Sequence, residues 1–141
     1  MPKTNVLLTT NILHKECGEP TGILFLAAYL RKNGFDVDIF DPEILGDKDF
    51  SGLSTLCKKM YGLAGISVLT SSNSSLLAVA KMAAVIHKEL PDSIIACGGI
   101  GASLRFKEFV NIEFIDLVVM GEGENTVLEI LSKILYACSS I

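Results

Sequence analysis

The chain has 141 residues, enough for one domain with a substantial core, and half of these residues are hydrophobic. The formal net charge is −4, so the chain lacks the basic surface that binds nucleic acid, and we expect no nucleic-acid partner. The longest uncharged run, Met60–Ala80, has the length of a membrane span, but the polar cluster Thr70–Ser75 divides it, and we expect no membrane segment. The chain begins without the apolar stretch of a secretory leader, so we expect a cytoplasmic protein.

Four cysteines are spread through the chain without forming a closely spaced pair. This spacing excludes a compact zinc or iron–sulfur motif, so we expect free thiols in a reducing compartment and no metal site built from side chains. The cysteines are Cys17, Cys57, Cys97 and Cys138.

Five short apolar segments rich in β-branched residues alternate with segments of helical periodicity. The expected strands are Asn5–Thr10, Asp36–Phe40, Leu63–Val68, Ser93–Cys97 and Phe114–Met120. The expected helices are Thr21–Asn33, Phe50–Tyr61, Ser74–Leu90, Leu104–Val110 and Glu124–Ala137. This alternation predicts one α/β domain over residues 1–141, with a doubly wound, flavodoxin-like (Rossmann-like) fold and a five-stranded parallel sheet of order 2-1-3-4-5.

Local signals support several of these boundaries. Asn33-Gly34 suits a left-handed cap at the end of the first helix. Pro91 ends the helix that precedes it, and Ser74 or Ser75 is expected to cap the start of that helix.

The fold predicts where a ligand binds. Open α/β sheets bind ligands beyond the carboxyl ends of their strands, near the point where the strand order reverses. Three of the loops there are rich in Gly, Ser and Thr, which lets a flat, bulky ligand approach the backbone, although turns favour the same residues for structural reasons. The loops are Thr9–Gly22, Asp41–Gly46, Ser67–Asn73, Gly98–Ser103 and Gly121–Asn125.

Several common ligands of this fold lack their motifs here. The first strand is not followed by G-x-G-x-x-G, and no G-x-x-x-x-G-K-[S/T] run occurs, which disfavours dinucleotides and P-loop phosphate binding. The third strand ends in Ser67-Val68-Leu69 rather than in the aspartate of a phosphotransfer receiver. Binding of flavin mononucleotide remains an alternative, because Thr9-Thr10-Asn11 could hold a phosphate. However, flavin sites usually place aromatic side chains on both sides of the ring, and Phe106 is the one aromatic residue that these loops offer.

Four segments together resemble a known family. They are Gly18–Asp41 (GEPTGILFLAAYLRKNGFDVDIFD), Gly65–Ser72 (GISVLTSS), Gly98–Ser103 (GGIGAS) and Gly121–Glu124 (GEGE). In this order and spacing the chain resembles the cobalamin (vitamin B12)-binding domain found N-terminal in cobalamin-dependent radical S-adenosylmethionine enzymes. The resemblance implies a corrinoid cofactor whose cobalt carries a methyl group.

The resemblance also implies the site. The family signatures S-x-L and G-G, which surround the nucleotide tail of the cofactor, fall on Ser67-Val68-Leu69 and Gly98-Gly99. We expect the two glycines to leave room for the tail, so that Gly99→Val would weaken binding and leave the fold intact. The full set of expected cofactor-binding residues is Thr10, Asn11, Glu19, Pro20, Thr21, Gly22, Ser67, Val68, Leu69, Thr70, Ser71, Gly98, Gly99, Ile100, Gly101, Gly121, Glu122 and Gly123.

The wider family ligates cobalt with the histidine of D-x-H-x-x-G, and that histidine is missing here. Aligning its last glycine on Gly22 places Glu19 at the histidine and Cys17 at the aspartate. Members from radical enzymes generally lack this histidine too, so the resemblance implies a base-off cofactor without a histidine ligand. Two further departures are Gly101, where these members often have histidine, and Met120, where they often have arginine.

The remaining candidates have simpler interpretations. We expect His14 to be a solvated loop residue, His87 to lie on the surface and Cys97 to lie in the core. Glu122 and Glu124 resemble an acid–base pair, but acidic residues are favoured at any helix start.

These observations predict a domain that binds cobalamin without turning over a substrate by itself. The chain has no C-x-x-x-C-x-x-C, so we expect no iron–sulfur cluster in it. The expected partner is a radical S-adenosylmethionine iron–sulfur domain, in the same longer chain or in trans, and the expected chemistry is methyl transfer. The alternatives are a degenerate, cofactor-free interaction module and a flavodoxin-like domain that binds flavin mononucleotide.

Overall fold

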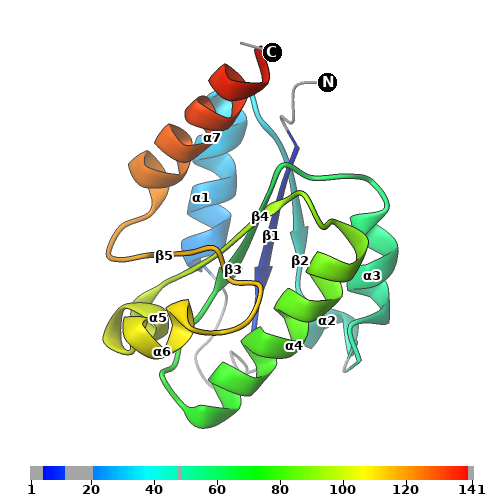
Figure 1. Cartoon of the computed structure of the whole chain (residues 1–141), viewed down its shortest axis with the longest axis vertical. Helices are drawn as coiled ribbons and strands as arrows, with labels where there is room; N and C mark the ends of the chain where they lie inside the picture. Colours follow the sequence, from blue (N-terminus) through cyan, green and yellow to red (C-terminus); the bar gives the residue numbers. More distant parts are fainter. Residues whose placement is uncertain (1–4, 12–20, 48, 140–141) are drawn as a thin grey trace.

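A computed structural model describes residues 5–11, 21–47 and 49–139 of the chain. Its centre is a parallel sheet of five strands in the order β2-β1-β3-β4-β5, which confirms the predicted topology. Figure 1 shows the strands side by side with helices in front and behind. The strands are β1 (Asn5–Thr10), β2 (Asp36–Phe40), β3 (Leu63–Ser67), β4 (Ile94–Gly98) and β5 (Leu117–Val119).

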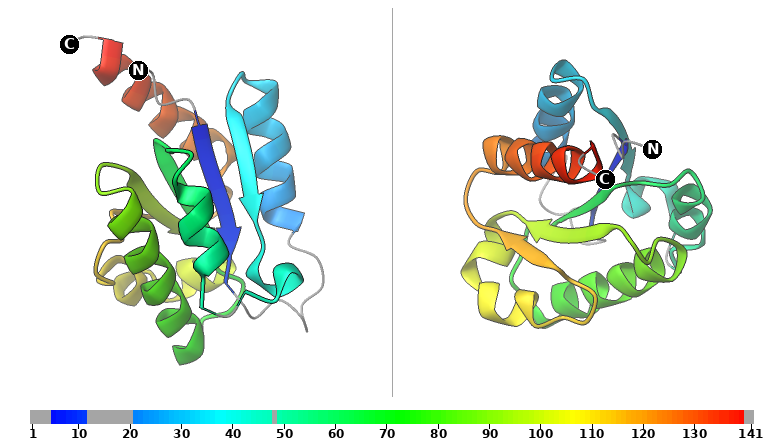
Figure 2. Two further views of the ribbon diagram at one scale, coloured as in Figure 1. Left: turned by 90° about the vertical axis from the view of Figure 1, so that its right-hand side faces the viewer. Right: turned by 45° about the horizontal axis from the view of Figure 1, so that its top comes forward.

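Helices cover both faces of the sheet. The first and last helices lie together on one face, and the others lie on the opposite face or at its edge, as both views in Figure 2 show. The helices are α1 (Thr21–Lys32), α2 (Pro42–Leu45), α3 (Ser51–Cys57), α4 (Asn73–Glu89), α5 (Ile100–Leu104), α6 (Phe106–Val110) and α7 (Glu124–Ser139).

Two short helices, α2 and α5, occupy segments that the sequence had predicted as loops. In α2 the Asp41 side chain accepts hydrogen bonds from the backbone N–H groups of Glu43 and Ile44, at 3.0 and 3.3 Å. Gly46 then ends the turn in the left-handed region, with φ of 64°. Single capped turns of this kind carry no apolar periodicity, so a pattern search does not detect them.

The residue that caps the start of α4 is not the predicted one. The N-cap is Ser72, whose Oγ accepts a hydrogen bond of 3.1 Å from the N–H of Ser75, so Ser74 and Ser75 lie inside the helix. The other predicted signals hold: α1 ends before Gly34, which has φ of +90°, and α4 ends before Pro91.

The two faces of the sheet have separate cores. The face under α3, α4, α5 and α6 is packed with large side chains, among them Phe50, Met82, Ile86 and Phe109. The face under α1 and α7 is built around Leu8, Ile23, Leu30, Val127 and Leu131. Among the described residues no helix combines the length and the apolar character needed to cross a membrane.

Candidate functional site

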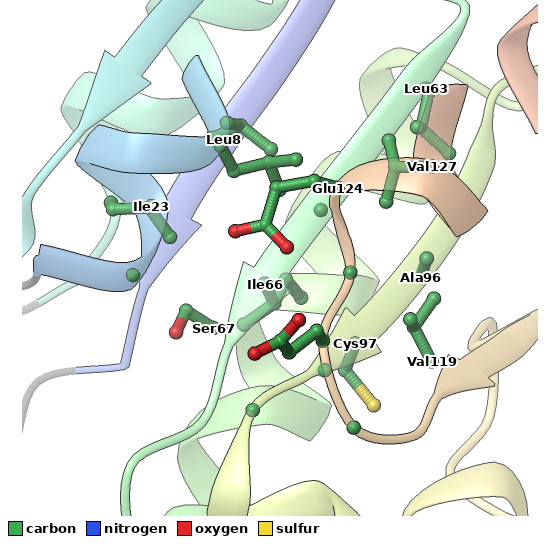
Figure 3. Close-up of a pocket in the computed structure, with 18 residues that line it drawn as sticks. Leu8, Ile23, Leu63, Ile66, Ser67, Ala96, Cys97, Val119, Glu124 and Val127 are labelled. Atoms are coloured by element: carbon green, nitrogen blue, oxygen red, sulfur yellow. The ribbon is translucent and has the colours of Figure 1, made fainter. Parts of the chain in front are cut away.

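A cavity of about 270 Å³ lies between the sheet and the helices α1 and α7 (Figure 3). Its exposed lining residues, Gly22, Gly121 and Glu122, all lie at the carboxyl edge of the sheet, so the cavity opens there. This is the edge at which the topology predicts a ligand. The lining comprises Leu8, Gly22, Ile23, Leu26, Leu63, Gly65, Ile66, Ser67, Ala96, Cys97, Gly98, Gly99, Val119, Gly121, Glu122, Gly123, Glu124 and Val127.

Small residues on β3 and β4 create this cavity. Side chains alternate between the two faces of a strand, so one face of β3 and β4 carries Gly65, Ser67, Ala96 and Gly98. Gly65 pairs with Ala96 and Ser67 pairs with Gly98, which places all four in one block. Larger side chains at these positions would fill the space beneath α1 and α7.

The helices α1 and α7 form the outer wall. The first two turns of α1 contribute Gly22, Ile23 and Leu26, and α7 contributes Glu124 and Val127. The two helices are joined by a hydrogen bond of 2.8 Å, in which the Tyr29 hydroxyl donates to Oδ1 of Asn125. Gly22 leaves the wall open, because a Cβ at this position would have no heavy atom within 4 Å.

Two carboxylates lie on the wall of this mostly apolar cavity. Glu122 is exposed at the mouth, whereas Glu124, the first residue of α7, is half-buried. Figure 3 shows the carboxylate of Glu124 directed from the start of α7 across the sheet, on the face to which Leu8 belongs. Within residues 5–11, 21–47 and 49–137, no side chain donates a hydrogen bond to Glu124 or pairs with its charge.

The structure brings seven of the expected cofactor-binding residues together around the cavity. They are Gly22, Ser67, Gly98, Gly99, Gly121, Glu122 and Gly123. Nine others do not line it: Thr10, Asn11, Thr21, Val68, Leu69, Thr70, Ser71, Ile100 and Gly101. Glu19 and Pro20, together with Cys17 and His14, lie outside the described residues.

Sequence reasoning missed most of the cavity's apolar lining. These residues are Leu8, Ile23, Leu26, Leu63, Gly65, Ile66, Ala96, Cys97, Val119 and Val127, to which Glu124 is added. One signal was present, because a glycine in the middle of a strand, as Gly65 is, marks a bulge or a close approach of another group.

The structure changes the interpretation of Gly99 and Gly101. A Cβ at Gly99 would lie 2.6 Å from the backbone oxygen of Val68, and one at Gly101 would lie 2.4 Å from that of Thr70. Gly99 also has φ of +101°, which side chains rarely tolerate. The expectation that Gly99→Val leaves the fold intact is therefore wrong. Gly101 likewise leaves no space for a histidine in this backbone.

Thr10 and Asn11 lie beneath the surface, beside a cluster of hydroxyl groups. Asn11 Nδ2 donates a hydrogen bond of 3.0 Å to Ser75 Oγ, which lies 2.6 Å from Thr70 Oγ1. Thr10 Oγ1 and Asn11 Oδ1 are buried and have no hydrogen-bond partner within the described part of the chain. Because Thr9, Thr10 and Asn11 are all fully buried, they do not form an open phosphate cradle of the kind that flavin mononucleotide requires.

Cys97 and His87 are both packed against other parts of the domain. Burial raises the pKa of the Cys97 thiol to about 12, so the thiol is protonated at neutral pH and is a poor nucleophile. His87 is half-buried rather than on the open surface, because its ring stacks on Phe114 with centroids 4.1 Å apart. Among the described side chains, no group of three or more His, Cys, Asp or Glu residues could hold a metal ion.

Comparison with known proteins identifies relatives of similar kind. Residues 11–131 match the B12 binding domain family. The anaerobic magnesium-protoporphyrin IX monomethyl ester cyclase of Synechocystis sp. is 29% identical over 121 residues, which are 85% of this chain and 24% of the cyclase.

Solved structures of two radical S-adenosylmethionine enzymes with a bound cobalamin contain the same fold. TsrM from Kitasatospora setae, a radical S-adenosylmethionine methyltransferase solved with cobalamin and a [4Fe-4S] cluster, superposes with a TM-score of 0.83 and 22% identity, over 97% of this chain and 25% of TsrM. OxsB, a cobalamin-dependent S-adenosylmethionine radical enzyme solved with aqua-cobalamin, superposes with a TM-score of 0.72 and 23% identity, over 92% of this chain and 18% of OxsB. The chain thus spans about a quarter or less of the length of these relatives. The match over residues 11–131 covers most of the sequence, and the chain belongs to the B12-binding domain family.

Proposed function

We propose that this domain binds cobalamin, with the nucleotide base of the cofactor in the cavity and the corrin ring across the carboxyl edge of the sheet. The observation that carries the proposal is the cavity itself, which Gly22, Gly65, Ser67, Ala96 and Gly98 keep open beneath α1 and α7. Membership of the B12-binding family supports the choice of cofactor.

The dimensions of the cavity fit one part of the cofactor. Its volume of about 270 Å³ is near the lower end for small-molecule pockets, and its walls are mostly apolar. A flat bicyclic base suits such a space, whereas a corrin ring with its amide side chains is larger than the cavity. The corrin must therefore lie outside it, over the strand ends. Ser67 is placed to hydrogen-bond the base, and Gly22 and Gly121 leave the entrance open.

The same placement implies a base-off cofactor without a histidine ligand. A base held in the cavity is no longer attached beneath cobalt. His87 is the one histidine among the described residues, and it lies on α4, on the opposite side of the sheet from α1 and α7, stacked on Phe114. The resemblance described above places Glu19, rather than histidine, at the family's ligating position.

We further propose that the domain serves a radical S-adenosylmethionine domain, in the same longer chain or in trans. Bound cobalamin would supply a cobalt centre that carries a methyl group. The relatives are about four times longer than this chain, which leaves room for such a domain in each of them. At the carboxyl edge, Ile100, Leu104 and Met120 are 71%, 71% and 54% exposed. Exposed apolar groups of this kind are typical of surfaces that a ligand or a second domain covers.

Equilibrium dialysis of the purified domain against hydroxocobalamin tests the proposal. A free ligand concentration of about 100 μM detects any site with a micromolar dissociation constant. We expect retention of cobalamin and weaker retention of flavin mononucleotide. A folded domain that retains neither would be a cofactor-free interaction module, and retention of flavin alone would favour a flavodoxin-like function.

One pair of variants locates the ligand. Gly22→Leu adds a side chain at the cavity wall, where a Cβ meets open space, so the fold should persist while the affinity for cobalamin falls at least tenfold, about 1.4 kcal/mol. The matched control is Ala28→Leu, because Ala28 is an exposed residue of α1 that does not line the cavity. Equal affinities for the two variants would place the base elsewhere.

The electron paramagnetic resonance spectrum of the bound Co(II) form tests the axial ligand. A nitrogen attached to cobalt splits the lines into triplets, and we expect single lines. Triplets that disappear in His14→Ala would identify His14 as the ligand. Triplets that persist in this variant would show that the base of the cofactor is still attached.

A further inference from the structure

The two charged side chains that the described residues contribute to the cavity wall are both negative. Glu122 and Glu124 are carboxylates. Of the other described lining residues, only Ser67 and Cys97 have a polar or sulfur atom in the side chain, and the rest are aliphatic or glycine. Among the described residues, the lining contains no lysine, arginine, histidine, asparagine or glutamine. The side chains thus offer carboxylate acceptors and one hydroxyl to whatever enters.

Glu124 is the more buried of the two carboxylates. It is half-buried, and Figure 3 shows its oxygens directed across the sheet, on the face to which Leu8 belongs. Within the described part of the chain it has no hydrogen-bond donor or cationic partner. Its position in the first turn of α7 explains how the charge is tolerated, because a helix start stabilises a nearby anion. The same carboxylate remains available to a ligand.

An occupant that covers Glu124 removes water from this carboxylate. Covering it with an apolar ring leaves a charged acceptor without a donor, which is costly. Covering it with a ring that carries an N–H group replaces the lost water with a charge-assisted hydrogen bond. Among flat bases of similar size, such a carboxylate would therefore favour those that carry a hydrogen-bond donor.

We infer that Glu124 makes the cavity selective for a corrinoid whose lower base carries an exocyclic amine, such as an aminopurine, over one whose base is dimethylbenzimidazole. The inference rests on the proposed function, because it assumes that the base enters the cavity. The aminopurine donates its N–H to Glu124, while the face of the ring packs on the apolar lining. Dimethylbenzimidazole, with two methyl groups and no N–H in its neutral form, covers the same carboxylate without compensating it.

The experiment compares dissociation constants for three corrinoids by equilibrium dialysis at pH 7. Cobalamin and its adenine-bearing analogue differ only in the base, and cobinamide lacks the nucleotide. We expect the adenine analogue to bind at least tenfold more tightly than cobalamin, about 1.4 kcal/mol, and cobinamide to bind most weakly. Glu124→Gln removes the charge, and Glu124→Met also removes the acceptor at similar length, so the preference should fall in the first variant and vanish in the second.

The control variant is Glu129→Gln on the same helix. Glu129 is exposed, lies outside the cavity lining and pairs with Lys133 at 3.2 Å, so its loss changes the net charge equally and should leave the preference intact. Equal affinity for the two complete corrinoids in the parent domain, or tighter binding of cobalamin, would overturn the inference while preserving the proposed function. Cobinamide binding as tightly as both would show that no base enters the cavity. Failure of all three to bind would overturn the inference and the proposed function together.

Discussion

The two faces of the sheet are built from the same strands and differ in how closely they are packed. On the face under α3, α4, α5 and α6, the core contains Met82, Ile86, Leu90 and Phe109, each at most 1% exposed. On the face under α1 and α7, the strand residues Gly65, Ser67, Ala96 and Gly98 leave a cavity of about 270 Å³. One face is packed throughout, whereas the core of the other leaves a cavity at the carboxyl edge of the sheet.

This difference follows from the two-residue alternation of side chains along a strand. Along β3, Ala64 and Ile66 belong to the packed face, whereas Leu63 belongs to the core beside the cavity, where Gly65 and Ser67 follow it. The domain therefore combines a closely packed core on one face with a core that leaves space at the carboxyl edge on the other. We expect substitutions on the packed face to change stability, and substitutions around the cavity to change binding.

The largest expected effect is loss of stability in Phe109→Ala. Phe109 is fully buried in the packed core, and removal of a buried phenylalanine costs about 3–5 kcal/mol. Denaturant unfolding measures this change. The matched control is Phe25→Ala, because Phe25 is 71% exposed and its truncation should change the free energy of unfolding by less than about 0.5 kcal/mol. A similar loss in both variants would contradict the division between packed and exposed positions.

The second prediction separates two kinds of glycine. Gly101→Ala should destabilise the domain by about 1–3 kcal/mol, because the new Cβ would lie 2.4 Å from the backbone oxygen of Thr70. Gly22→Ala meets open space within α1 and should keep or raise stability by up to about 1 kcal/mol, because alanine favours a helix. Thermal unfolding of the two variants tests the comparison. Equal and small changes would mean that the backbone near Thr70 moves to make room.

The sequence predicted the sheet much better than the cavity. Apolar runs and helical periodicity identified all five strands and their order, because both depend on local pattern and on the handedness of crossovers. The cavity depends on which face of β3 and β4 carries the small residues, and on how far α1 and α7 stand from them. Gly99 is the clearest example of what the sequence does not predict. The pair Gly98-Gly99 was interpreted as leaving space for a ligand, whereas a Cβ at Gly99 would collide with the backbone of Val68. Glu124 was interpreted as a helix-start residue in preference to half of an acid–base pair, and its direction into a cavity was not predicted, since that direction is a tertiary feature.

The third prediction concerns the stability of the domain at alkaline pH, which depends on two buried thiols of the packed face. Burial raises the pKa of Cys57 to about 11 and that of Cys97 to about 12, from an ordinary value of 9.0. The unfolded chain releases these protons first, so the thiols contribute stability fully below pH 9.0, and this contribution is lost as the pH rises toward the folded values. We expect the free energy of unfolding to fall above pH 9.0, and to fall less steeply in a Cys57→Ala/Cys97→Ala variant. Parallel pH profiles for the parent and the variant would refute this assignment.

The smallest expected effect lies at the edge of the packed face, where Asp38 on β2 accepts hydrogen bonds of 2.7 Å from both Lys59 Nζ and Tyr61 Oη. These two bonds, that of Lys59 first, hold the pKa of Asp38 below its ordinary value of 3.8. A depressed pKa means that the carboxylate contributes stability above pH 3.8, and that this contribution is lost as the pH falls through the lower folded value.

Asp38→Asn should therefore lower the free energy of unfolding at pH 7. In strong acid the side chains of Asp38 and of the substituted Asn are both neutral, so the parent and the variant should differ less in stability there. The comparison variant is Asp36→Asn, because Asp36 is 62% exposed and lies 3.6 Å from Lys59 without a hydrogen bond to Tyr61. Urea unfolding at pH 7 and near pH 2 would measure both variants. The effect should be small, because ion pairs that retain contact with water contribute little to stability.

Cobalamin affinity should not change in either variant, because neither residue lines the cavity. A change in affinity would mean that β2 and the cavity are coupled, and that the two faces are less independent than their packing implies.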